Sequence, residues 1–161
     1  MPKNFVVNAS PLIVLGKIGL LDLLPKLANE LVIPKGVQIE IEAGSPEDPA
    51  RKWINSQGKV FVKDVGQPEI EILKWDLGLG ETEVLSLAYR DKSFVAIVDD
   101  RAARRCAKVL DIETKGTLAL LVLAKKEGLL PEITSILDRL LKAGFRLSQD
   151  LLETAKRLAG E

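Results

Sequence analysis

Oxygen-bearing polar side chains stand where predicted strands and helices of this sequence meet. Asn8 ends an apolar strand, Glu40 lies on an early helix, and Glu81 opens a central helix. Asp99 and Asp100 directly follow the most apolar strand. Carboxylate and amide oxygens are the ligands that Mg²⁺, Mn²⁺ and Ca²⁺ prefer in proteins. This set of residues therefore predicts a divalent-metal site built from several separate elements.

The chain of 161 residues contains no histidine. This absence excludes a His general base, a Ser-His-Asp triad and the usual zinc hydrolases. Hydrolysis of a phosphodiester then needs another means to activate water and to offset charge at phosphorus. Carboxylate-held Mg²⁺ or Mn²⁺ supplies both, so metal-dependent phosphodiester hydrolysis is the chemistry that these residue types favour.

Each acidic residue also has an ordinary structural interpretation. Asp at a strand-to-helix turn is a common N-cap, and Glu81 in a first helical turn offsets the helix dipole. Glu40 on a helix surface is compatible with simple solvation. Only the joint placement of these residues on separate elements favours a metal site, and both interpretations stay open at this point.

The elements that must position these residues alternate between strands and helices. Strands are predicted at 5–8, 30–33, 60–62 and 94–98, and the last is the continuous apolar run typical of a parallel sheet covered on both faces. Helices are predicted from Ser10-Pro11, through 20–24, at 36–43 (also compatible with a strand), 50–57 and 68–75, from Glu81, after Asp99-Asp100, and at 118–127, 132–141 and 149–159. This alternation indicates an α/β fold with a parallel sheet and right-handed crossovers. Sites in such sheets form at the carboxyl ends of the strands, where Asn8 and the Asp pair would lie.

Composition narrows the class of protein further. Hydrophobic residues make up 47% of the chain, enough for the core of one domain. The 23 acidic and 23 basic residues cancel, so any affinity for nucleic acid must come from local patches. No apolar stretch is long enough to cross a membrane, and the first residues lack the pattern of a signal peptide. The expected location is the cytoplasm, without membrane association.

Four basic residues recur at helical spacing just after the Asp pair. Arg101, Arg104, Arg105 and Lys108 share one face of the predicted helix. The face begins beside Asp99-Asp100, so it could guide a phosphate backbone toward the metal. A solvated face whose charges pair with nearby acids is an equally good interpretation.

Two hydroxyl residues could support the acidic set. Ser10 could donate a hydrogen bond to a carboxylate or to a water on the metal, although Ser-Pro also signals an N-cap and a helix start. Thr117 follows Gly116 at another helix start and has the same two interpretations.

Several short runs of the sequence resemble the PIN-domain superfamily, in particular its branch of small prokaryotic predicted nucleic-acid-binding proteins. The runs are Val7-Asn8-Ala9-Ser10-Pro11-Leu12-Ile13; Ile33-Pro34 with Val37 and Glu40; Gly78-Leu79-Gly80-Glu81-Thr82-Glu83; Asp99-Asp100-Arg101 with Ala103-Arg104; Gly116-Thr117-Leu118; and Ala143-Gly144-Phe145-Arg146-Leu147-Ser148. They span nearly the whole chain in the order that the family has them. Each run is weak alone, and the ordered set is specific.

The resemblance implies a three-layer α/β/α fold with a central, mainly parallel sheet. It implies a single domain over residues 1–161, with a helical C-terminal part at about 118–161. It also implies a catalytic and metal-binding set made of Asn8, Glu40, Glu81 and Asp100. Asp99 is the alternative for the last position, and Glu42 and Glu83 are the alternatives for the middle two.

The resemblance also implies a function. Active PIN proteins are Mg²⁺- or Mn²⁺-dependent nucleases, and many are ribonuclease toxins of toxin–antitoxin pairs that form homodimers. The expected activity is therefore metal-dependent endoribonuclease cleavage of single-stranded RNA, with an antitoxin protein and a second copy of the chain as partners. This sequence departs from the family pattern at Asn8, where an amide replaces a carboxylate. The alternative function is a catalytically weak or inactive module that binds nucleic acid or protein.

Overall fold

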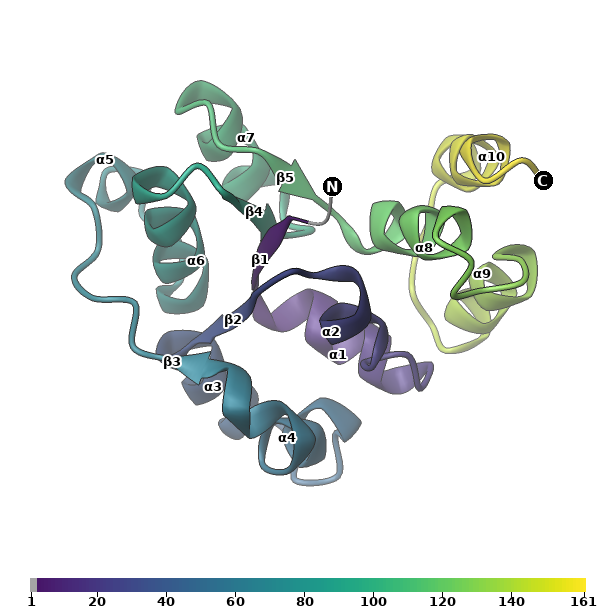
Figure 1. The fold of residues 1–161 in the computed structure, drawn as a ribbon, viewed down its shortest axis with the longest axis horizontal. Helices are drawn as coiled ribbons and strands as arrows, with labels where there is room; N and C mark the ends of the chain where they lie inside the picture. Colours follow the sequence, from purple (N-terminus) through teal and green to yellow (C-terminus); the bar gives the residue numbers. More distant parts are fainter. Residues whose placement is uncertain (1–2) are drawn as a thin grey trace. The chain divides into compact units, whose positions relative to one another are not determined.

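The computed structural model describes residues 3–161 as an α/β protein with a five-stranded, all-parallel sheet flanked by helices (Figure 1). The predicted fold class is confirmed. The strands lie in the order β3-β2-β1-β4-β5, with β1 at the centre. Their bounds are β1 Asn4–Val7, β2 Leu31–Pro34, β3 Val62–Lys63, β4 Phe94–Ile97 and β5 Thr114–Lys115.

Helices fill the connections between these strands and continue after β5. Their bounds are α1 Ala9–Lys17, α2 Leu23–Leu27, α3 Lys35–Glu42, α4 Pro49–Ile54, the 3₁₀ helix η1 Gln57–Phe61, α5 Ile70–Leu73, α6 Leu79–Arg90, α7 Arg101–Val109, α8 Thr117–Lys126, α9 Thr134–Lys142 and α10 Gln149–Leu158. The segment 36–43, which was compatible with helix or strand, is helical as α3. The strand predicted at 60–62 is mostly the 3₁₀ helix η1, and the two-residue strand β5 was not predicted at all.

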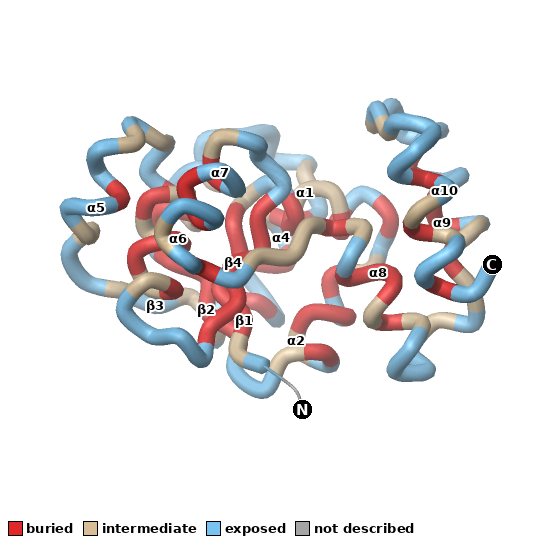
Figure 2. The backbone as a smooth tube through the Cα atoms, turned by 90° about the horizontal axis from the view of Figure 1, so that it is seen from above, coloured by how far each residue is buried: buried red, intermediate tan, exposed pale blue. Residues whose placement is uncertain are grey.

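The three central strands form the buried core of the sheet. Every residue of β2 and β4 is buried, as are three of the four residues of β1 (Figure 2). Strands buried on both faces read as continuous apolar runs, which is why the pattern of β4 was recognisable in the sequence. The outer strand β3 is short and partly exposed, so its sequence carries a weaker signal.

The predicted N-cap of the first helix is wrong. α1 begins at Ala9, and Asn8 precedes it in an extended conformation with φ −80° and ψ 168°. Ser10 therefore lies inside the first turn and does not cap the helix. Pro11 is accommodated in the same turn because the first N–H groups of a helix have no intrahelical acceptor. This shift places Asn8 at the junction of strand and helix.

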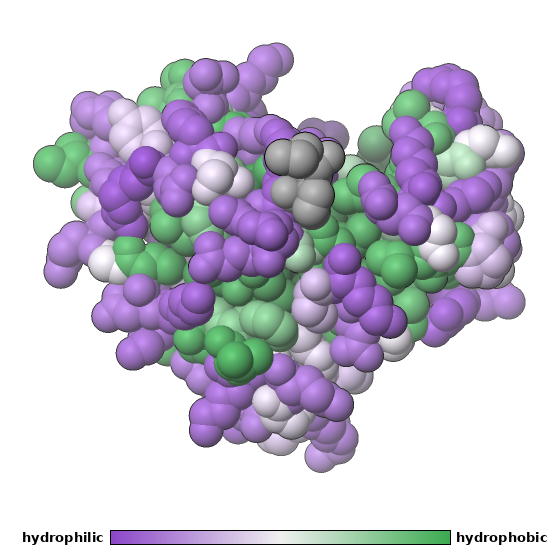
Figure 3. Space-filling model, in the orientation of Figure 1, coloured by the Kyte–Doolittle hydropathy of each residue, from purple (hydrophilic) through white to green (hydrophobic). Residues whose placement is uncertain are grey.

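The described chain divides into two compact units, one ending at Gly116 and the other beginning at Thr117. The first unit contains the whole sheet, and the second contains α8, α9 and α10. Hydrophilic residues cover much of the face in Figure 3, with apolar residues in patches between them. No helix within residues 3–161 is long and apolar enough to cross a membrane.

The carboxylate of Glu161 contacts residues of α8 and of the start of α9 in the second unit. It accepts hydrogen bonds from the backbone N–H groups of Ile133 and Thr134, at 2.8 and 3.0 Å, and from the Thr134 hydroxyl. Lys125 adds an ion pair at 3.0 Å. The carboxylate thus caps α9 from outside that helix and offsets its dipole. The bond from the Thr134 hydroxyl and these other contacts lower the pKa of Glu161 to about 2.

We expect Glu161→Gln to destabilise the second unit at neutral pH. A carboxyl whose folded-state pKa is depressed stabilises the fold above its ordinary pKa of 4.5 and loses that contribution as pH falls toward 2. Hydrogen exchange of amides in α8 to α10 should be faster in the variant at pH 7. The difference should shrink as pH approaches 2. Glu127→Gln, which removes the same charge from an exposed position of this unit, is the control.

Candidate metal centre at the carboxyl ends of β1 and β4

Two of the predicted site residues follow neighbouring parallel strands. β1 pairs with β4 in register up to Val7 and Ile97, so the chain leaves both strands at the same edge of the sheet. The backbone N–H of Asn8 donates to the carbonyl of Ile97 at 3.0 Å and extends the pairing by one bond. From β1 the chain first builds β2 and β3 on one side and then β4 and β5 on the other. Asn8 and Asp100 therefore lie at the topological switch point, where open parallel sheets place their sites.

Glu40 reaches this region because a glycine of α6 makes room for it. α3 packs directly on α6. A Cβ atom at Gly80 would lie 1.9 Å from Oε1 of Glu40 and 3.1 Å from Cγ2 of Val37. The carboxylate of Glu40 thus rests over the backbone at Gly80, next in sequence to Glu81. A glycine inside a helix is unfavourable by about 1 kcal/mol relative to alanine, and this close approach is the reason for it here.

Glu81 lies at the centre of the acidic group. It is half-buried in the first turn of α6. Burial raises its pKa above the ordinary 4.5, and the nearby negative charges of Asp100 and Glu40 raise it further. Negative charges that raise the pKa of a carboxyl must lie close to it in space. The structure therefore brings together carboxylates from α3, α6 and the end of β4, which are far apart in the sequence.

Asn8 belongs to the same group through a hydrogen bond. Its side chain is buried, at 4% exposure, and it makes no cap bond to α1. The amide bonds the carboxylate of Glu81 instead, which lowers the pKa of Glu81 and partly opposes the other effects. An amide has both donor and acceptor atoms, so Asn8 can orient Glu81 and still offer an oxygen to a cation.

The two consecutive aspartates point to different neighbours. The negative charge of Asp100 raises the pKa of Glu81. Oδ2 of Asp100 also accepts a hydrogen bond from the backbone N–H of Ala103 at 3.0 Å, because Asp100 is the N-cap of α7. Oδ1 of Asp99 instead faces Gly116, where a Cβ atom would meet it at 2.8 Å and Nη1 of Arg104 at 3.1 Å. The charge of Asp100 raises the pKa of Glu81, which associates Asp100 with the acidic group.

The alternative acids for the middle positions have other partners. Glu42 forms an ion pair with Arg51 at 3.3 Å. Oε1 of Glu83 accepts the N–H of Gly36 at 2.6 Å and so caps the first turn of α3 from outside. This bond ties α3 to α6 close to Glu40. Glu83 is therefore a structural neighbour of the acidic group, and the geometry favours Glu40 and Glu81 for the site.

The two predicted supporting hydroxyls belong to different compact units of the chain. Ser10 is exposed in the first turn of α1, two residues after Asn8. Thr117 is buried and opens α8 in the second unit, whereas the acidic group belongs entirely to the first.

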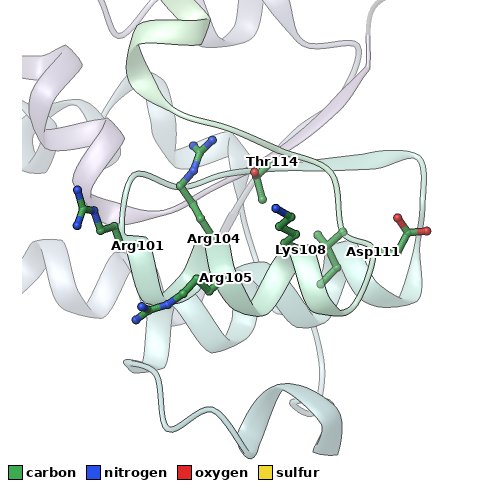
Figure 4. Close-up of a pocket in the computed structure, with 7 residues that line it drawn as sticks. Arg101, Arg104, Arg105, Lys108, Asp111 and Thr114 are labelled. Carbon is green, nitrogen blue, oxygen red and sulfur yellow. The ribbon is translucent and has the colours of Figure 1, made fainter. Parts of the chain in front are cut away.

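The four predicted basic residues line one pocket of about 520 Å³ (Figure 4). All four are exposed on α7, while Ala103, Cys106 and Ala107 of the same helix are buried. The remaining lining residues, which the sequence did not identify, are Asp111, Ile112 and Thr114. They come from the turn after α7 and from β5, a strand too short to leave a clear pattern.

The acidic group suits a hard divalent cation in its chemistry. Its donors are oxygens only, and a cation would relieve the mutual repulsion that raises the pKa of Glu81. Within residues 3–161, however, no three acidic or cysteine side chains converge closely enough to form a complete ligand set as they stand. The two observations agree because repulsion between charges reaches farther than a coordination bond. The site is a crowded acidic group that a cation could draw together.

The match of a family model now identifies the class of protein. A model described as a PIN domain matches residues 4–161, almost the entire chain. No curated protein matches the sequence. The chain belongs to the PIN-domain family. Members of this family are generally nucleases that use divalent metals, and this membership makes nuclease activity the coarse functional assignment.

We expect Glu81→Gln to stabilise the protein at neutral pH when no divalent cation is present. A carboxyl whose pKa is raised in the folded state contributes most to stability below 4.5, and that contribution is lost as pH rises through its folded pKa. The neutral glutamine keeps the shape and removes the repulsion. Urea unfolding in EDTA should show a more stable variant at pH 7.5 and equal stabilities below pH 4.5.

Glu47→Gln is the matched control for this comparison. The side chain of Glu47 is 85% exposed, and its only salt bridge in the described chain is a surface pair with Lys52. Such pairs contribute little to stability. A Glu81→Gln protein that is less stable than wild type at pH 7.5 would contradict the presence of a repulsive acidic group.

Proposed function

We propose that this protein is a metal-dependent endoribonuclease whose site is the acidic group of Glu40, Glu81 and Asp100 with Asn8. The observation that carries the proposal is the raised pKa of Glu81, whose causes include two carboxylates from separate elements. A carboxyl whose pKa is raised by burial and by neighbouring negative charges, near the switch point of a parallel sheet, favours a functional site over a solvated surface. Membership in the PIN-domain family supports the same chemistry.

Each residue of the group has a separate task in this proposal. Asp100 is held by its cap bond to Ala103, which fixes the carboxylate at the end of β4. Asn8 orients the carboxylate of Glu81 through its hydrogen bond. Glu40 is held over Gly80 by the packing of α3 on α6. These backbone and packing contacts position each side chain, and a bound cation would draw the carboxylates closer together.

These four residues would hold Mg²⁺ or Mn²⁺. When bound, such a cation activates water and offsets negative charge at phosphorus. The three carboxylates supply the charge that attracts the cation, and Asn8 supplies a neutral oxygen. The proposed substrate is single-stranded RNA. The proposed partners, which follow from the ribonuclease toxins of this family, are an antitoxin protein and a second copy of the chain.

A second candidate function is a binding module without catalysis. The observation that favours it is Asn8, an amide where a further carboxylate would strengthen cation binding. One negative charge fewer weakens the attraction for a divalent ion, since affinity rises with the charge of the ligands. The two functions differ in whether the wild-type protein binds Mn²⁺ specifically.

We expect wild-type protein with Mn²⁺ to cleave single-stranded RNA and Asp100→Asn to lower the rate by at least about a hundredfold. Loss of even an outer-shell partner of a metal site costs roughly 10- to 100-fold, so loss of a charged ligand should cost no less. Asparagine is as good an N-cap as aspartate, so the bond to Ala103 and the start of α7 should survive. The measurement is the initial rate of cleavage across several RNA sequences.

The control is Asp76→Asn, which removes one charge from an exposed residue with a positive φ of 52° that asparagine also tolerates. This control should cleave like wild type. Equal rates for wild type and Asp100→Asn, or no cleavage by wild type, would refute the proposed activity.

We expect Asn8→Asp to tighten Mn²⁺ binding by about tenfold and to reduce stability in EDTA at neutral pH. The new carboxylate adds ligand charge, yet it also replaces a donor to Glu81 with a repelling charge. Calorimetric titration with Mn²⁺ and urea unfolding would measure the two effects. The control is Asn29→Asp, an exposed residue outside the acidic group. If Mn²⁺ binds only the Asn8→Asp protein, the binding module is the better assignment.

A further inference from the structure

We infer that the basic pocket on α7 binds phosphate groups of a single-stranded polynucleotide, beyond the bond that the acidic group would cleave. The pocket is the one lined by Arg101, Arg104, Arg105 and Lys108. The inference rests on the proposed function, because the bound strand would be the substrate of that site. It adds a second contact region that reads the backbone of the strand and has no part in the chemistry.

Most of the positive charge in this pocket is uncompensated. Within the part of the chain that the structure describes, Arg101, Arg105 and Lys108 form no salt bridge. The acid among the lining residues is Asp111, whose carboxylate points away from Lys108 (Figure 4). The alternative interpretation from the sequence was that these basic residues form ion pairs with nearby acids. Arg101, Arg105 and Lys108 form no such pair in the described chain. Unpaired cations gathered in a concave site attract anions.

Arg104 links the pocket on α7 to Val98, which follows β4 and precedes the two aspartates. Its Nη1 donates to the carbonyl of Val98 at 3.1 Å, and it shares the approach to Gly116 with Asp99. In Figure 4 the side chain of Lys108 points toward Thr114. Arg104 is thus a fixed wall of the pocket, which leaves the three unpaired cations for a ligand.

The basic residues of the pocket follow Asp100 directly in the sequence and lie along one helix. α7 begins at Arg101, the residue after Asp100. From Arg101 to Lys108 the axis of α7 advances roughly 10 Å, at 1.5 Å per residue. A strand whose phosphodiester lies at Asp100 can therefore extend over α7 and place its next phosphates among these cations. Basic residues that contact phosphates fix the position of a strand without reading its bases.

The lining favours the backbone of a strand over its bases. None of the described residues that line the pocket is aromatic, whereas stacking of bases uses aromatic side chains. Its volume of about 520 Å³ is in the range of small-molecule sites, which admits a short length of single strand. Contacts made only by charge should be independent of base sequence and sensitive to salt.

The test measures binding of fluorescein-labelled oligouridine to the full chain in EDTA. Fluorescence anisotropy gives the affinity at each of several salt concentrations. The test variant is Arg105→Gln with Lys108→Gln, which changes two exposed residues outside the acidic group. Affinity decreases with salt, and each phosphate contact to a single strand contributes about 0.7 to the steepness of log affinity against log salt. Loss of two contacts should therefore make this dependence less steep by about 1.4. Affinity for a dodecanucleotide should fall, and equally for oligouridine and oligoadenosine.

The matched control is Lys26→Gln with Lys59→Gln, which removes the same charge from exposed residues elsewhere in the first unit. It should bind like wild type. Glutamine is a good helix former, so circular dichroism should show both double variants folded. An unchanged affinity and slope in the test variant, or an equal loss in the control, would overturn the inference.

A competition experiment separates a strand from a free nucleotide, because both carry phosphate. Uridine monophosphate should displace the dodecanucleotide only weakly. Displacement by the mononucleotide at an affinity equal to that of the strand would make the pocket a nucleotide site and overturn the assignment. Binding in EDTA does not depend on cleavage. A protein that cleaves RNA without using the pocket, and one that binds RNA there without cleaving, are thus distinguishable outcomes.

Discussion

Repulsion between carboxylates is the interaction that the site has to withstand. Glu40, Glu81 and Asp100 lie close enough for two of them to raise the pKa of the third. Charges of one sign separate unless the surrounding structure holds them. Three local contacts do so: the cap bond from Ala103 to Asp100, the packing of α3 against α6 at Gly80, and the bond from Asn8 to Glu81. These backbone and packing contacts keep the carboxylates together although their charges repel one another.

The fold could be predicted from the sequence, and candidate site residues could be named, because their signals are local. The run at 94–98 is apolar throughout, since β4 is buried on both faces. Parallel strands bring their carboxyl ends to one edge, so Asn8 and Asp100 could be placed together from chain order alone. The spacing of the basic residues on α7 likewise needs only the period of a helix.

Features that depend on tertiary contact left little or no signal in the sequence. The two residues of β5 are too few to show a pattern, so Thr114 was missed as a lining residue of the basic pocket. The orientation of Asp99 and Asp100 depends on Gly116, Arg104 and the start of α7, none of which periodicity can place. Gly80 offered a partial signal, because a glycine inside a helix usually marks a close approach. Its partner, Glu40, lies forty residues away in the sequence.

The net charge of the chain is zero, yet two groups of opposite charge lie near the end of β4. They are the acidic group and the basic pocket on α7. Asp100 contributes to the acidic group, while Asp99 and Arg104 converge on Gly116 beside the basic pocket. A polyanion that enters the pocket on α7 meets repulsion where it approaches Asp100. A divalent cation in the acidic group would remove that repulsion. Binding of the cation and of the strand would then be thermodynamically linked, each strengthening the other by the same factor.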